Sequence, residues 1–205
     1  MHAVIFLGGA AFCLPDTVRE ELFPADMVIA ADRGWDNAIA NGVTPDLLVG
    51  DMDSIDKVPS GIETIRVPSV KNDADGQLAV ELALARGASR ITLFGQFSGR
   101  LDHTLSALFM LDALKKQGVD AEMIDDRNRV SLVQNESVTL TRRGYKYFGA
   151  LSLGETVYSA HGCFYEVENV PLRRWESTYG ISNEIVAGRA ELTFSGDAAF
   201  LIESL

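Results

Sequence analysis

The spacing of short apolar runs in the first 126 residues is the strongest constraint on the fold. These runs are rich in β-branched residues and occupy residues 4–7, 27–31, 47–49, 64–67, 91–94 and 121–124. Helical patterns lie between some of them, at residues 75–86 and 103–117. Strands that alternate with helices are typical of βαβ units, whose strands are parallel. The sequence therefore predicts an N-terminal α/β domain at residues 1–126, with a mostly parallel sheet.

The pattern changes after residue 126. Short strand-like runs follow one another without a helical pattern, at residues 130–133, 137–141, 145–151, 155–159, 164–167, 184–186, 191–194 and 200–203. Short strands with turns every ~8–12 residues are typical of an antiparallel sandwich. We therefore expect a second domain at residues 127–205, which folds as a small antiparallel β-sandwich.

Composition excludes several classes of protein. The 29 acidic and 18 basic residues give a net charge of −11, which disfavours nonspecific nucleic-acid binding because that requires clustered positive charge. No apolar run approaches the ~18 residues of a membrane span, and the first residues lack the basic region of a signal peptide. Cys13 and Cys163 form no disulfide or metal pattern, so we expect a protein of the reducing cytoplasm.

Polar clusters follow several predicted strands of the first domain. They occupy residues 8–10, 31–34, 50–54 and 95–103, and a further cluster at 71–75 opens a predicted helix. Ligands bind beyond the carboxyl ends of the strands in an open parallel sheet. We therefore expect the ligand-binding residues in these clusters.

Asp51 and Asp53 are the most informative pair in these clusters. Two carboxylates one residue apart repel each other unless a cation lies between them, and carboxylate oxygens favour a hard ion such as Mg²⁺. An Asx-turn explains the same residues by local backbone geometry alone. Asp32 and Asp75, which occupy other loops of this domain, favour the Mg²⁺ interpretation.

The cluster at 95–103 can supply a phosphate site. Its glycines let backbone N–H groups approach a phosphate, and the guanidinium of Arg100 can contact two phosphate oxygens. Asp102 is expected by its position to be the N-cap of the following helix. Lys71 is either a phosphate ligand or a solvated loop lysine. By themselves, the polar residues 180–184 in the second domain predict only a connection between two strands.

Four of these segments together resemble the thiamine pyrophosphokinase family. They are Ala-Asp-Arg-Gly at 31–34, Gly-Asp-Met-Asp-Ser at 50–54, Gly-Arg-Leu-Asp-His-Thr at 99–104 and Gly-Ile-Ser-Asn-Glu at 180–184. The resemblance covers nearly the whole chain and implies an α/β domain followed by a β-sandwich. It also implies transfer of a diphosphoryl group from ATP to thiamine, which gives thiamine diphosphate and AMP.

The resemblance also implies the site residues. Mg²⁺ on the triphosphate would be held by Asp32, Asp51, Asp53 and Asp75. The expected catalytic residues are Asp53, Arg100 and Asp102. The residues expected to bind the nucleotide, its phosphates or thiamine are Lys71, Asp75, Arg100, Asp102, Ser182 and Asn183. Ser182 and Asn183 would reach thiamine across the interface of a homodimer, so that each active site is composite.

Three positions depart from the family pattern, and two other functions stay open. The family usually has Asp-x-Thr-Asp at positions 72–75, where this chain has Asn72 in place of the first Asp and Ala74 in place of Thr. The family also commonly has Gly in place of Arg33. One alternative is a thiamine- or nucleotide-binding sensor without catalytic activity. The other is a metal-dependent phosphatase with Asp51 as the nucleophile.

Overall fold

A computed structural model describes residues 1–205 except residues 9–11, 53–59, 68–74, 96, 98–99 and 177. The chain divides into two compact units, Met1–Asp126 and Arg127–Leu205. Each unit has its own sheet architecture. No helix in the described ranges is both long enough and apolar enough to cross a membrane.

The first unit is built on a parallel sheet. Its strands lie in the order β6-β5-β1-β2-β3-β4, and each neighbouring pair is parallel. Their bounds are β1 (His2–Phe6), β2 (Met27–Ala31), β3 (Leu47–Gly50), β4 (Glu63–Arg66), β5 (Arg90–Phe94) and β6 (Asp120–Ile124). The central strands are almost wholly buried, as expected for a parallel sheet covered on both faces. The predicted α/β architecture is confirmed.

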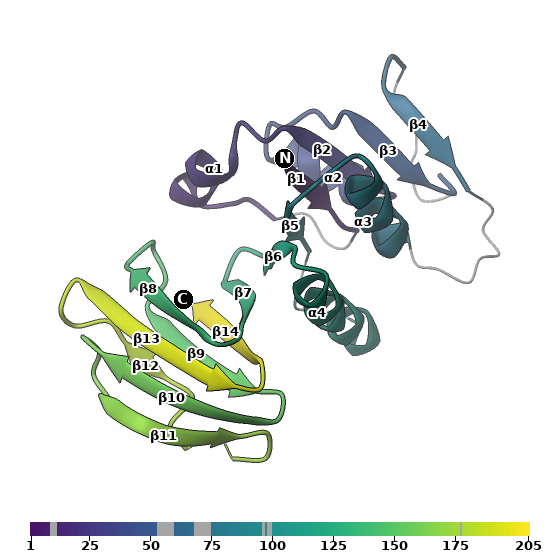
Figure 1. Ribbon diagram of the computed structural model, residues 1–205. Coiled ribbons are helices and arrows are strands. Elements are labelled where there is room, and N and C mark those ends of the chain that lie inside the picture. Colours follow the sequence, from purple (N-terminus) through teal and green to yellow (C-terminus); the bar gives the residue numbers. More distant parts are fainter. Residues whose placement is uncertain (9–11, 53–59, 68–74, 96, 98–99, 177) are drawn as a thin grey trace. The chain divides into compact units, whose positions relative to one another are not determined.

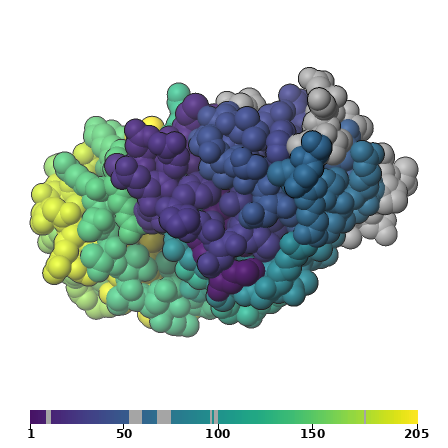
Figure 2. Space-filling model, turned by 90° about the horizontal axis from the view of Figure 1, so that it is seen from above, coloured from purple at the N-terminus to yellow at the C-terminus, as the bar shows by residue number. Residues whose placement is uncertain are grey.

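Helices cover this sheet (Figure 1). They are α1 (Asp16–Leu22), α2 (Gly34–Ala40), α3 (Asp75–Ala85) and α4 (Leu101–Lys116). The sequence predicted α3 and α4 but missed α1 and α2, which have seven residues each. Two turns are too short for an apolar period of 3.6 residues to repeat clearly. In the space-filling view, residues of the N-terminal elements, coloured purple to blue, lie together on the face that is seen (Figure 2).

The second unit contains two antiparallel arrangements of strands. One has the order β12-β9-β14-β7 and the other has the order β11-β10-β13-β8. Their bounds are β7 (Asn128–Val133), β8 (Glu136–Thr141), β9 (Tyr147–Ser152), β10 (Glu155–His161), β11 (Val167–Arg173), β12 (Asn183–Glu184), β13 (Arg189–Gly196) and β14 (Ala199–Ser204). Side chains from both arrangements share one apolar core that includes Phe148, Tyr158 and Leu192. The predicted sandwich is confirmed.

One predicted strand of the second unit is wrong. Residues 164–166 form no strand, and β11 runs instead from Val167 to Arg173. Phe164 and Tyr165 have high strand propensity, but their side chains are 67% and 58% exposed and belong to a loop. Pro171 is tolerated in β11 because that strand lies at the edge of its sheet.

Candidate functional site

The register of β2 and β3 brings two of the predicted metal ligands to one edge of the sheet. Ala31 pairs with Val49, so Asp32 and Asp51 follow the carboxyl ends of neighbouring strands. The backbone N–H of Asp32 donates to the carbonyl of Val49 at 2.8 Å, which ties the two strand ends together. Both aspartates are partly buried. The structure therefore places Asp32 and Asp51 at the edge where parallel sheets bind ligands.

The backbone at these strand ends is shaped around the Asp32 carboxyl group. Gly50 has φ 151°, and a Cβ at this position would lie 2.6 Å from Oδ1 of Asp32. Asp32 and Met52 have φ of 51° and 65°, in the left-handed region that residues with a side chain rarely adopt. Such strain persists where surrounding structure enforces it, and it is concentrated at functional sites. Because Gly50 has no Cβ, the Asp32 carboxyl group can occupy this space.

Asp75 is the first residue of α3, and Asp53 and Lys71 lie outside the described residues. Among the residues that the structure describes, no three His, Cys, Asp or Glu side chains gather closely enough to hold a metal ion. Asp32 and Asp51 nevertheless supply carboxylate oxygens at one sheet edge, which is the donor chemistry that Mg²⁺ requires. The described residues therefore fit part of a magnesium site.

Arg100 and Asp102 lie together at the start of α4. The guanidinium donates from Nε to Oδ1 of Asp102 at 3.1 Å and from a terminal nitrogen to Oδ2 at 2.5 Å. Hydrogen bonding from Arg100 lowers the pKa of Asp102, and the same contact raises the pKa of Arg100. Both side chains are exposed. The fork of Arg100 is thus presented in the geometry that suits two oxygens of one anionic group.

The N-cap prediction for Asp102 is wrong. The helix begins at Leu101, and its N-cap is Arg100, which has an extended backbone and makes no capping hydrogen bond through its side chain. Asp102 lies within the first turn, where its carboxylate accepts from the N–H of His103 at 3.0 Å. A carboxylate in the first turn is favourable because of the positive end of the helix dipole.

One acidic residue at the same edge was missed by sequence reasoning. Asp125 directly follows β6, is buried, and accepts at 3.1 Å from the backbone N–H of Phe97, which lies beyond the end of β5. A hydrogen bond thus joins Asp125, the residue after β6, to Phe97. Its position directly after the predicted strand at residues 121–124 was the available signal.

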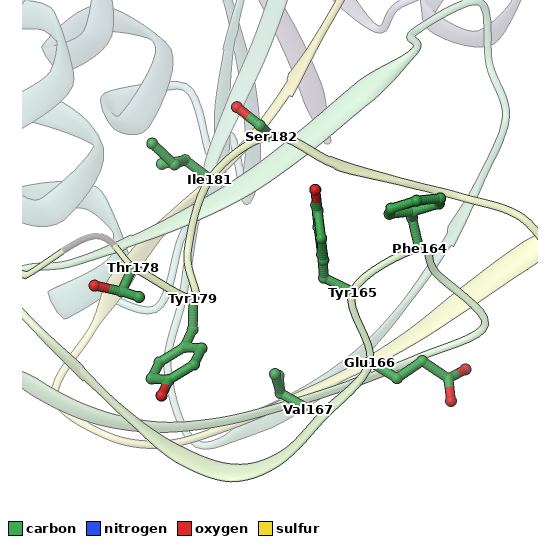
Figure 3. Close-up of a pocket in the computed structure, with 8 residues that line it drawn as sticks. All are labelled: Phe164, Tyr165, Glu166, Val167, Thr178, Tyr179, Ile181 and Ser182. Atoms are coloured by element: carbon green, nitrogen blue, oxygen red, sulfur yellow. The ribbon is translucent and has the colours of Figure 1, made fainter.

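The second unit contains a pocket of about 600 Å³. It is lined by Phe164, Tyr165, Glu166, Val167, Thr178, Tyr179, Ile181 and Ser182. Figure 3 shows the ring of Tyr165 extending toward the segment that carries Ser182, whereas the carboxylate of Glu166 points away from the other side chains. Exposed rings beside a few polar groups are suited to a flat, partly polar ligand.

Close approach of two backbone segments builds one side of this pocket. The N–H of Ala150 in β9 donates to the carbonyl of Gly180 at 2.5 Å. A Cβ on Gly180 would collide with the carbonyl oxygen of Ala150, and a Cβ on Gly149 would lie 2.8 Å from the carbonyl oxygen of Gly180. Glycine at both positions lets the segment with Ile181 and Ser182 lie directly on β9.

The two predicted thiamine-binding residues differ in their surroundings. Ser182 is exposed, has φ 60° and lines the pocket. Asn183 is 3% exposed and is not among the lining residues. Two neighbouring positions in the sequence therefore differ, because Ser182 lines the pocket and the buried Asn183 does not.

Comparison with known proteins gives consistent results. The family model for "Thiamin pyrophosphokinase, catalytic domain" matches residues 18–123. The thiamine pyrophosphokinase of Bacillus subtilis (strain 168) is 24% identical over an alignment of 185 residues, and the match covers 86% of this chain and 86% of that protein. Thiamin pyrophosphokinase 1 of Caenorhabditis elegans is 28% identical over an alignment of 173 residues, and the match covers 78% of this chain and 70% of that protein.

A solved structure shows the same fold. The crystal structure of the thiamine pyrophosphokinase from Bacillus subtilis has a TM-score of 0.87 at 22% identity, and the match covers 100% of this chain and 99% of the other. The matched catalytic domain spans just over half of the 205 residues and includes Asp32, Asp51, Asp75 and Arg100. The resemblance seen in the sequence is therefore confirmed, and this chain belongs to the thiamin pyrophosphokinase family.

Proposed function

We propose that this thiamine pyrophosphokinase performs its reaction at the carboxyl edge of the first unit and holds thiamine in the pocket of the second. The reaction transfers a diphosphoryl group from ATP to the hydroxyl of thiamine and gives thiamine diphosphate and AMP. The observation that carries the proposal is the family match across residues 18–123, which contain the paired strand ends with Asp32 and Asp51. In this proposal, residues 1–126 are the catalytic domain and residues 127–205 the thiamine-binding domain.

The carboxylates of the first unit would hold Mg²⁺ on the triphosphate. The proposed ligands are Asp32, Asp51, Asp53 and Asp75. Bound Mg²⁺ neutralises negative charge on phosphate oxygens and orients the triphosphate. The carboxylate chemistry of Asp32 and Asp51 at one sheet edge supports this assignment.

Positively charged side chains would stabilise the charge that develops during transfer. The thiamine hydroxyl oxygen attacks the β-phosphorus in line, the bond from that phosphorus to the oxygen on the α-phosphorus breaks, and AMP leaves with that oxygen. Arg100 would contact two oxygens of the transferring group, and Lys71 would contact the phosphates as a point charge. The hydroxyl proton would pass to the carboxylate of Asp53 or Asp102.

The pocket of the second unit would bind the rings of thiamine. Its exposed aromatic side chains offer flat apolar surface, and the Ser182 hydroxyl offers a hydrogen bond. A pocket of about 600 Å³ is within the size range of small-molecule sites, roughly 300–1,000 Å³. These features support the assignment of Ser182, with Asn183 beside it, to the thiamine site.

We further propose a cytoplasmic homodimer with two composite sites, in which each thiamine pocket serves the partner's catalytic edge. Twofold pairing is the commonest assembly of this kind. The test mixes an Asp51→Asn chain with a Tyr179→Ala, Ser182→Ala double variant at low thiamine, after verified subunit exchange. Random exchange makes half of the dimers mixed, each with one intact site, so up to about a quarter of wild-type activity should return. No recovery would show that each site lies within one chain.

The reaction itself is tested by incubating the protein with ATP, Mg²⁺ and thiamine and separating the products by chromatography. Equal amounts of AMP and thiamine diphosphate are expected. Binding of thiamine without AMP formation would instead indicate the sensor. A covalent phosphoenzyme caught by rapid quenching would indicate the phosphatase.

A further inference from the structure

The side chain of Asn183 is bonded to both backbone polar groups of Tyr165. Its Oδ1 accepts from the Tyr165 N–H at 3.0 Å, and its Nδ2 donates to the Tyr165 carbonyl at 2.9 Å. Oδ1 also accepts from the N–H of Glu184 at 3.0 Å, and Nδ2 contacts Sγ of Cys163 at 3.4 Å. Both polar atoms of the Asn183 amide are therefore bonded within the protein, and the residue is only 3% exposed.

These bonds fix a loop whose rings face outward. Phe164 donates its backbone N–H to the Glu184 carbonyl at 2.9 Å, so the loop is held beside β12 at consecutive residues. The rings of Phe164 and Tyr165 meet edge to face with their centroids 4.9 Å apart. Both rings line the pocket and are mostly exposed. Where these rings stand therefore depends on the loop backbone that Asn183 holds.

We propose that Asn183 is a positioning residue for thiamine, which acts through Tyr165 and does not contact the substrate itself. It sets the aromatic wall of the pocket by pairing with the Tyr165 backbone, as supporting hydrogen bonds do for binding residues elsewhere. This inference rests on the proposed function of the pocket. It assigns Asn183 a different role from that proposed for the neighbouring Ser182.

A double-mutant cycle with Asn183→Ala and Tyr165→Ala tests the inference. Misplacing or removing the ring should raise KM for thiamine about tenfold in either single variant. KM for ATP and kcat should change by no more than about twofold, because the catalytic edge is untouched. The double variant should be no worse than about twofold beyond Tyr165→Ala, because Asn183 has nothing left to position.

Two further variants keep the result interpretable. Asn183→Asp retains the side-chain size and an acceptor oxygen for the Tyr165 N–H, and its KM for thiamine should lie between those of wild type and Asn183→Ala. Thr139→Ala is the matched control, because it removes one exposed hydrogen bond, from Thr139 to Glu191 at 2.8 Å, in the same unit. The control should leave KM for thiamine unchanged.

A readout independent of turnover is hydrogen–deuterium exchange of the peptide that contains Phe164 and Tyr165. It should exchange faster in Asn183→Ala than in wild type and in Thr139→Ala. A KM for thiamine about 100-fold above wild type in the double variant, which is the product of the two single effects, would overturn the positioning role while wild-type activity stands. Unchanged exchange in Asn183→Ala would overturn it as well. Wild-type protein that forms no thiamine diphosphate would overturn the proposed function and this inference with it.

Discussion

The proposed catalytic edge of the first unit and the pocket of the second unit are built in different ways. At the edge, neighbouring parallel strands end side by side. The pairing of Ala31 with Val49 alone brings Asp32 and Asp51 to the ends of adjacent strands. In the pocket, loops supply the walls, and their positions depend on side-chain bonds such as those of Asn183 and on close backbone contacts at Gly180. The proposed catalytic residues of the first unit are thus positioned by the sheet, and the proposed thiamine-binding residues of the second unit by loops.

Because of this difference, substitutions in the two units should have different kinetic effects. Substitutions at the sheet edge should lower kcat, because they remove charge that acts on the reacting phosphates. Substitutions in the pocket should raise KM for thiamine and leave KM for ATP unchanged. The predictions below test this division, from the largest effect to the smallest.

Asp51→Asn should have the largest effect. Loss of one carboxylate from the proposed magnesium site should lower kcat by about 10³-fold or more, with little change in the free energy of unfolding. Product formation at saturating substrate and urea unfolding measure the two quantities. Near-normal kcat would remove Asp51 from the metal assignment.

Arg100→Ala should lower kcat by about 30- to 1,000-fold, because a charged contact to the transferring group is lost. Arg100→Lys should recover only part of the rate, since an ammonium group cannot contact two oxygens in the same planar geometry. Rates of AMP release from both variants provide the measurement. Full recovery with lysine would show that charge alone suffices at this position.

Tyr179→Ala tests the pocket of the second unit. The ring lines the pocket, and its loss should raise KM for thiamine about tenfold, an effect typical of one aromatic contact. KM for ATP should not move. A fall in kcat with unchanged KM for thiamine would contradict the division between the two units.

Gly50→Ala separates site geometry from stability. The new Cβ would collide with the Asp32 carboxyl group, whereas Gly87, at φ 91°, has nothing within 4 Å of its Cβ position. Both substitutions should cost about 1–2 kcal/mol of unfolding free energy, because both place alanine at positive φ. Only Gly50→Ala should also lower kcat, by displacing Asp32. Equal activity of the two variants would show that the Asp32 position is unimportant.

Substitution of His2 should have the smallest effect, and this effect should be on stability and not on kcat. It begins β1, at the end of the sheet away from the strand termini that carry Asp32 and Asp51. Burial, followed by the positive charge of Arg90, lowers the pKa of His2 below 6.5. Between the lowered pKa and 6.5 the unfolded chain binds more protons, so this residue makes stability fall as the pH falls through that window.

Comparison of His2→Gln with wild type tests the pH effect. Thermal unfolding midpoints measured between pH 5 and pH 8, roughly the range in which histidine titrates, should fall less steeply toward acid in the variant. Identical pH profiles would contradict the role of His2. The kcat of His2→Gln at neutral pH should equal that of wild type.

Much of the first unit could be predicted from its sequence. Buried parallel strands form continuous apolar runs, so polar residues such as Asp32 and Asp51 mark the strand ends directly. The same rule applied to Asp125 would have placed it at this edge, where it accepts a hydrogen bond from the N–H of Phe97. Helices α1 and α2 could not be found in this way, because two helical turns give too little periodicity.

The pocket of the second unit could not be predicted to the same depth. Phe164 and Tyr165 have high strand propensity. Only tertiary hydrogen bonds, from Tyr165 to Asn183 and from Phe164 to Glu184, show that they form a loop wall. The different surroundings of Ser182 and Asn183 are also invisible in the sequence, since both are small polar residues at consecutive positions. Asp53 and Lys71 lie outside the described residues, and their assignments stay predictions.

Equilibrium binding of radiolabelled thiamine to Asp51→Asn and to Tyr179→Ala tests the central claim most directly. The claim is that the first unit performs the transfer and the second holds the thiamine rings. Asp51→Asn should bind thiamine with an affinity within about twofold of wild type, whereas Tyr179→Ala should bind it about tenfold more weakly. Weakened thiamine binding in Asp51→Asn together with normal binding in Tyr179→Ala would contradict the account.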